Sequence, residues 1–117
     1  MRKVLVISFT PIYNLDGELS SMLGSIYDDD IDLLTRYWYD IRDLFVEVIS
    51  YGMSGVEIML YFENLEIFEK FSKLEALKIM EIKRYIEVYG GKTKVIIGNN
   101  IYDMQIAGAL FELIPVA

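Results

Sequence analysis

The sequence predicts an α+β domain whose elements follow the order strand, helix, strand, strand, helix, strand, helix. Three observations lead to this order. Two short apolar runs, one near the N-terminus and one near residue 95, have the composition of buried strands. Two longer segments repeat apolar residues at helical spacing. Between them, a glycine-flanked loop joins two runs rich in β-branched and aromatic residues, as in a β-hairpin.

The first predicted strand covers Val4 to Phe9, an apolar run that stops before Pro11. Residues 10–27 contain Pro, Asn, Asp and Gly, which favour turns, and predict a loop. The first helix is expected from Asp28 to Phe45. Its apolar stripe repeats at the 3.6-residue period and consists of Ile31, Leu34, Trp38, Ile41 and Phe45.

A hairpin is expected next, with strands over 46–51 and 56–63 around the loop 52–55. Asn64 suits the N-cap of a long helix that ends before Gly90-Gly91. The apolar stripe of this helix changes side near residues 72–75. That change predicts either a bend or a second partner surface.

The last strand is expected over 94–98. A final helix should then run from Asn99 or Asn100 to Glu112. The apolar side of that helix would consist of Ile101, Met104, Gly108 and Phe111.

The predicted order is similar to the ferredoxin-like βαββαβ arrangement, an antiparallel sheet with two helices on one face, here with an extra C-terminal helix. The similarity concerns architecture alone, and many unrelated functions use this arrangement. The first and last strands are apolar on both faces. We therefore expect the open sheet face to be covered by the last helix or by a second subunit.

The chain of 117 residues fits a single domain, residues 1–117. Its apolar fraction of 54% exceeds the usual value of about 45–50%. No apolar run reaches the ~18 residues of a membrane span, and the N-terminal run predicts a strand rather than a signal peptide. We therefore expect a cytoplasmic homodimer. Abundant Glu, Lys and Ile fits a thermophilic source and fits AT-rich codon usage equally well.

The chain contains no His and no Cys. This removes the commonest general base, the thiol nucleophile and the thiolate zinc site. We predict no catalytic residue, no cofactor and no resident metal, and expect a binding protein rather than an enzyme. An enzyme that depends on carboxylates and a metal ion is the third alternative.

Negative charge is concentrated in one segment. Nine acidic and two basic side chains lie between residues 14 and 47, which accounts for the whole net charge of −7. The simplest interpretation is that these carboxylates cap the first predicted helix. A cap needs only one or two of them, so the surplus suggests recognition of a basic protein surface, as in an inhibitor or adaptor, and a Mg²⁺ or Ca²⁺ site is the third alternative. The candidate partner-binding residues are Asp28, Asp29, Asp30, Asp32, Tyr39 and Asp43.

The alternative function is a small-molecule-sensing regulatory domain that binds its ligand at the 10–27 loop. The candidate ligand-binding residues there are Asp16, Gly17 and Glu18. Nucleic acid is not an expected partner, because a net charge of −7 repels phosphate and residues 55–62 lack the ribonucleoprotein strand signature. The lysines of the second helix are interspersed with Glu, as on a solvated helix face.

Overall fold

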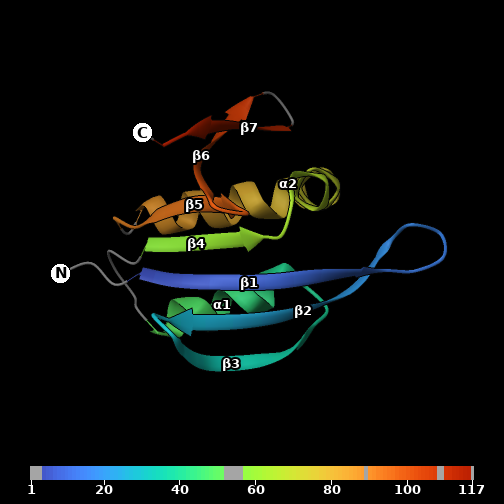
Figure 1. Cartoon of the computed structure of the whole chain (residues 1–117), viewed down its shortest axis with the longest axis horizontal. Helices are drawn as coiled ribbons and strands as arrows, with labels where there is room; N and C mark the ends of the chain where they lie inside the picture. Colours follow the sequence, from blue (N-terminus) through green and yellow to red (C-terminus); the bar gives the residue numbers. More distant parts are fainter. Residues whose placement is uncertain (1–3, 52–56, 89, 108–109, 117) are drawn as a thin grey trace.

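The structure, a computed structural model, describes residues 4–51, 57–88, 90–107 and 110–116. These residues form one mixed sheet of seven strands and two helices (Figure 1). The order across the sheet is β3-β2-β1-β4-β5-β6-β7. The elements are β1 (Val4–Tyr13), β2 (Leu19–Asp28), β3 (Ile31–Trp38), α1 (Ile41–Tyr51), β4 (Glu57–Phe62), α2 (Leu65–Val88), β5 (Lys92–Ile97), β6 (Asn100–Ala107) and β7 (Leu110–Pro115).

The three central strands are parallel, and an antiparallel meander lies on each side of them. β1 pairs with β4 and β4 with β5 in parallel, whereas β1–β2–β3 and β5–β6–β7 pair antiparallel. The connections β3–α1–β4 and β4–α2–β5 both step in the same direction across the sheet. Because such crossovers are right-handed, both helices lie on the same face (Figure 1).

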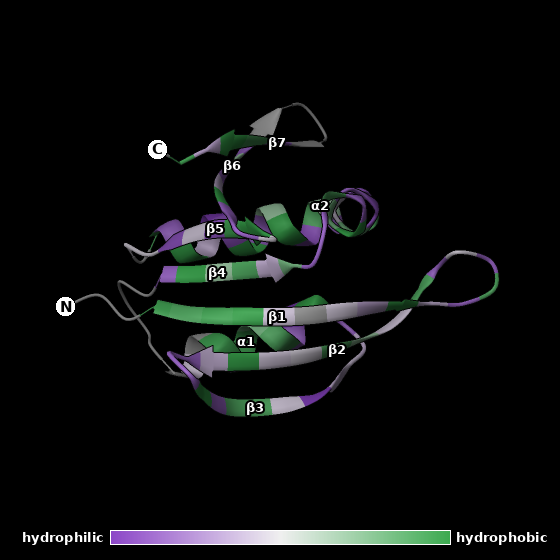
Figure 2. Ribbon diagram, viewed as in Figure 1, coloured by the Kyte–Doolittle hydropathy of each residue, from purple (hydrophilic) through white to green (hydrophobic). Residues whose placement is uncertain are grey.

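The core lies between this helix layer and the sheet. Alternate residues of the central strands point toward the helices and are fully buried, such as Leu5, Ile7 and Leu60. From the helices, Leu44, Phe45 and other apolar residues meet them. Figure 2 shows the apolar colour concentrated on the first half of β1 and on β4, at the centre of the sheet.

The predicted ferredoxin-like βαββαβ antiparallel sheet with an extra C-terminal helix is wrong. The sheet is mixed, and strands take the place of both the 10–27 loop and the last helix. The strands predicted over 4–9, 56–63 and 94–98 are present as the core of β1, as β4 and as β5. The predicted hairpin loop 52–55 lies outside the described residues.

The first predicted helix fails because its apolar stripe spans two elements. Residues 31–38 form β3, which pairs with β2 from Asp28↔Ile31 to Met22↔Trp38. The helix begins only at Ile41 and runs through the segment predicted as a strand over 46–51. Short apolar runs do not distinguish a strand from a helix by periodicity, and Ile, Thr, Tyr and Trp favour a strand here.

The predicted loop at 10–27 fails because Pro11 and Gly24 lie inside strands. Beyond Ser8, β1 no longer pairs with β4, so Pro11 lies where β1 has only β2 as a neighbour, an edge position at which proline is tolerated. Gly24 of β2 is buried directly against the indole of Trp38. Both residues are usual turn signals, and tertiary context overrides them here.

The last predicted helix is a β-hairpin instead. β6 pairs with β7 from Tyr102↔Pro115 to Ala107↔Leu110. Met104 is buried while its neighbours Asp103 and Gln105 are exposed, the alternation of a strand with one covered face. Residue 108, which belonged to the predicted stripe, lies outside the described residues.

The long helix agrees with its sequence signals. The side chain of Asn64 accepts a hydrogen bond from the N–H of Ile67 at 2.9 Å, which is N-cap geometry. Gly90 has φ of 79° just after α2, as at a helix end. The predicted bend is confirmed at Glu75, whose φ and ψ of −116° and 18° are not helical.

The second face of the sheet has no covering layer among the described residues. Val6, Met59 and Ile96 lie on it, half-buried by their cross-strand neighbours, and Val4 is 37% exposed. The expected cover by a last helix is therefore wrong, because that helix does not exist. In the described part of the chain, neither helix is long and apolar enough to cross a membrane.

Candidate binding surface between the two helices

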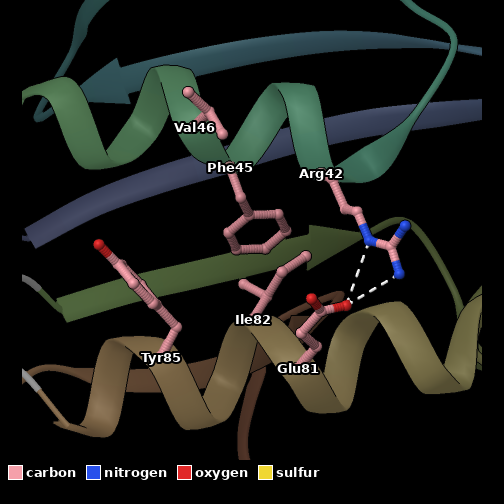
Figure 3. Close-up of a pocket in the computed structure, with 6 residues that line it drawn as sticks. All are labelled: Arg42, Phe45, Val46, Glu81, Ile82 and Tyr85. Atoms are coloured by element: carbon pink, nitrogen blue, oxygen red, sulfur yellow. Dashed lines mark hydrogen bonds and ion pairs between the residues drawn. The ribbon is translucent and has the colours of Figure 1, made fainter.

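A groove separates α1 from α2 on the outer side of the helix layer. It holds about 380 Å³ and is lined by three residues from each helix (Figure 3). The lining residues are Arg42, Phe45 and Val46 of α1, with Glu81, Ile82 and Tyr85 of α2. The groove therefore joins two segments that are about 40 residues apart in the sequence.

The floor of the groove is apolar and its rim exposes further apolar atoms. Phe45 and Ile82 face each other across it and are 2% and 7% exposed (Figure 3). Val46 and Tyr85 stand on the rim and are 68% and 48% exposed. A partner could therefore bury apolar area on both helices at once.

An ion pair between the helices closes one end of the groove (Figure 3). The guanidinium of Arg42 donates to Glu81 Oε2 from Nε at 3.2 Å and from Nη2 at 2.9 Å. Both side chains are more than half exposed. An exposed ion pair of this kind contributes about 0–1 kcal/mol to the free energy of unfolding. Its main effect here is to hold α1 and α2 in position relative to each other.

Asp40 sets the start of α1 and therefore the position of Arg42. Its carboxylate accepts the N–H of Arg42 at 2.9 Å and lies 3.3 Å from the ammonium of Lys78 on α2. Partial burial of the Asp40 carboxyl opposes ionisation, but the Arg42 N–H and the Lys78 charge outweigh it and hold its pKa below the usual value. Asp40 thus both caps α1 and ties it to α2.

The outer side of α2 carries apolar residues that no element of the described chain covers. Leu74 is 50% exposed, Leu77 79% and Val88 78%. Leu77 and Val88 are eleven residues apart in the part of α2 after the bend at Glu75, so they lie along one side of it together with Arg84, whereas Leu74 precedes the bend. A second hollow surrounds the bend at Glu75 and is lined by Arg42 and residues 73–78.

The acidic cluster lies at the tip of the β2–β3 hairpin and not at a helix N-terminus. Asp28 and Ile31 are paired, so Asp29 and Asp30 form a two-residue turn. Asp29 has φ of 53°, a left-handed conformation that such turns require and that Asp tolerates better than most residues. Ile31, beside the acids, is 65% exposed.

The six predicted partner-binding residues do not form one surface. Asp32 accepts a hydrogen bond from Thr35 at 2.6 Å near the hairpin tip. Tyr39 and Asp43 lie beyond the other end of β3, about 25 Å from that tip at ~3.3 Å per residue. Tyr39 is 80% exposed, as predicted, and Asp43 lies in the first turn of α1.

The predicted ligand-binding residues lie in the β1–β2 hairpin loop, which extends beyond the rest of the sheet (Figure 1). The side chain of Asn14 accepts the N–H groups of Asp16 and Glu18 at 3.0 and 2.9 Å. Gly17 has φ of 80°. These contacts close the loop on itself, as in a self-contained turn.

Carboxylates do not gather into a metal-binding group in the described residues: no set of three Asp or Glu lies close enough to hold an ion. The groove residues Phe45, Ile82 and Tyr85 were not among the predicted site residues. The one sequence signal for this surface is the apolar stripe of the long helix, because Leu74 and Leu77 depart from its buried side.

Comparisons with known proteins found no match for this chain among protein-family models, curated proteins or solved structures.

Proposed function

We propose that this chain is a non-enzymatic binding protein that docks a protein partner against the α1–α2 groove. The observation that carries the proposal is the exposure of Val46 and Tyr85 on the rim of an apolar groove of about 380 Å³, with exposed Leu77 one turn before Glu81 on α2. Contiguous exposed apolar surface of this kind is typical of interaction sites. Homodimer formation is part of the proposal.

The side chains at this surface are those that give binding energy at protein interfaces. Tyr85 offers a ring and a hydroxyl, and Arg42 offers a guanidinium, the kinds of residue enriched at interface hot spots. Phe45 and Ile82 form a preformed floor that needs no rearrangement. This combination suits a helix that lays its apolar side into a groove.

The length of the exposed stripe favours a protein over a small ligand. Leu77 and Val88, both after the bend at Glu75, are eleven residues apart, about 17 Å along the helix. A small molecule in the groove would leave both ends of the stripe in water. The small-molecule-sensing alternative therefore has less support than the protein-binding one.

The acidic hairpin tip is the second candidate contact for a basic protein partner. Asp30 has no ion-pair or hydrogen-bond partner among the described residues, and Ile31 beside it is 65% exposed. An apolar anchor next to uncompensated carboxylates suits a basic surface, chiefly through a faster association rate.

The docking surface can be tested with the fluorescent probe anilinonaphthalene sulfonate, which binds exposed apolar surface. The protein is titrated at submicromolar concentration, where weak self-association is minimal. We expect bright binding by the unaltered chain and a large loss in Val46→Lys. The matched control is Ile31→Lys, an equally exposed apolar residue on the hairpin. Equal fluorescence for all three proteins contradicts the proposal.

A further inference from the structure

We infer that the groove is occupied by α2 of a second copy of this chain, in a two-fold symmetric dimer. This inference rests on the proposed function, that the groove binds protein. It identifies the partner and the residues that meet. In this arrangement α2 of each subunit lies in the α1–α2 groove of the other subunit. The same surface of each chain therefore both inserts a helix and receives one, as two-fold symmetry requires.

The helix pair has the area of a small interface. The part of α2 after the bend at Glu75 has 13 residues and is about 20 Å long at 1.5 Å per residue, and together with α1 beside it is about 20 Å wide. The outer surface of this pair is therefore about 400 Å² on each subunit. A standard specific interface buries about 800 Å² on each partner, so we expect a weak dimer, with a dissociation constant in the micromolar range.

The ridge is made by the outer side of α2. Leu77 and Val88 project from it and are the most exposed apolar residues of the helix, at 79% and 78%. The groove floor of Phe45 and Ile82, with the rim residue Val46, supplies the opposing apolar surface. On the open sheet face the apolar residues of the central strands β1, β4 and β5 are half-buried or, at Val4, 37% exposed, whereas Leu77 and Val88 are 79% and 78% exposed, which is why we assign the dimer to the helix layer.

The charges of this layer are complementary to themselves. Asp43 on α1 and Arg84 on α2 are both exposed, and neither has an ion-pair partner among the described residues. When α2 lies in the partner's groove, the partner's α1 lies along the outer flank of α2, where Arg84 is. The dimer therefore forms two Asp43–Arg84 pairs, one on each side of the axis.

The level of the two residues along the helices agrees with this pairing. Arg42 bonds to Glu81, so the first turn of α1 lies beside the third quarter of α2, and both helices run in the same direction. A two-fold axis parallel to the helices does not shift residues along the helix direction, so each residue has the same height in both subunits. Arg84, three residues after Glu81, then lies within a turn of Asp43 of the other subunit.

The experiment is sedimentation equilibrium from about 1 to 200 μM, on the unaltered chain, Leu77→Lys, Ile31→Lys and Met59→Lys. We expect a dimer of twice 13.6 kDa for the unaltered chain. Leu77→Lys should raise the dissociation constant at least about tenfold, since each dimer loses two apolar contacts. Ile31→Lys, on the hairpin, and Met59→Lys, on the open sheet face, should dimerise as before. Circular dichroism confirms the fold of each variant, and Arg84→Glu replaces Leu77→Lys if that variant does not fold.

The other outcomes overturn the inference. A monomer at all concentrations does so, as does a dimer that survives Leu77→Lys or is lost in Met59→Lys or Ile31→Lys. The probe titration separates this failure from failure of the proposed function. A monomer whose probe binding is lost in Val46→Lys keeps the groove as a docking surface for a different protein, whereas a monomer with unchanged binding overturns both.

Discussion

Gly24 has no room for a side chain, because Trp38 lies directly over it. A Cβ at this position would come 2.9 Å from Cδ1 and 3.0 Å from Nε1 of the indole. The indole is 4% exposed, and Arg36 covers it at 4.5 Å from the ring centre. The ring therefore has little freedom to move away.

We predict that Gly24→Ala lowers the free energy of unfolding by about 1–3 kcal/mol, the usual cost of overpacking a tight site. Urea denaturation followed by circular dichroism measures it. The same substitution in a Trp38→Phe background should cost less, because the smaller ring leaves space. An equal cost in both backgrounds would show that the indole is not the cause.

Asp40 stabilises the start of α1 through a cap and a charge. We predict that Asp40→Ala lowers the free energy of unfolding by about 1 kcal/mol, because α1 loses its N-cap. Asp40→Asn keeps an acceptor for the cap and removes only the charge. Denaturation of both variants by urea at pH 7 separates the two contributions.

The charge of Asp40 also predicts a pH dependence. Its pKa is lower in the folded chain than the ordinary 3.8, so the ionised form stabilises the fold above that value. This stabilisation is lost as pH falls through the folded-state pKa. The difference between the unaltered chain and Asp40→Asn should therefore be present at pH 7 and disappear as the pH falls below 3.8 and through the lower folded-state pKa. A difference that persists unchanged at acid pH would contradict this assignment.

At the scale of the elements, the β2–β3 turn decides how residues 28–38 fold. Asp29 has a positive φ, whereas the φ of its neighbour Asp30 is not positive. We predict that Asp29→Gly leaves stability equal or higher, and that Asp29→Val lowers it by about 1–2 kcal/mol. Asp30→Val serves as the control and should cost less. A larger loss at Asp30 would contradict the turn described here.

Sequence patterns predicted α2 and β4 correctly because each has a clear apolar period, and the short apolar runs within β1 and β5 were also predicted as strands. α2 has an N-cap at Asn64 and Gly90 at its end, and β4 alternates buried and half-buried residues as its sequence indicates. The bend at Glu75 was also predictable, because an apolar stripe that changes side cannot face one sheet along a straight helix.

The failures arose where tertiary context decides between helix and strand. Ile31, Leu34 and Trp38 have helical spacing and also fit a strand, and only pairing with β2 selects the strand. Pro11 is acceptable in β1 because β4 is not its neighbour there, which a local pattern does not reveal. The same holds for the C-terminal hairpin, where β6 continues the sheet from β5.

At the scale of the whole molecule, the sheet separates the candidate surfaces that the sequence had joined. Because residues 31–38 form a strand, Asp30 at one end of β3 and Asp43 beyond the other do not act on one patch. The groove could not be predicted from the sequence, since it depends on two crossovers that place α1 beside α2. The one sequence feature that pointed to this surface is the set of leucines on α2 that lie off its buried side and are exposed.

The most direct test of the central claim, that the helix layer binds a second copy, is charge reversal across the proposed interface. Dissociation constants of Asp43→Arg, Arg84→Asp and the double variant are measured by sedimentation equilibrium. Each single reversal places like charges together twice in a dimer and should weaken it at least about tenfold, while the double variant should return to within about threefold of the unaltered chain. A double variant that is weaker than either single one, or single reversals without effect, would contradict the account.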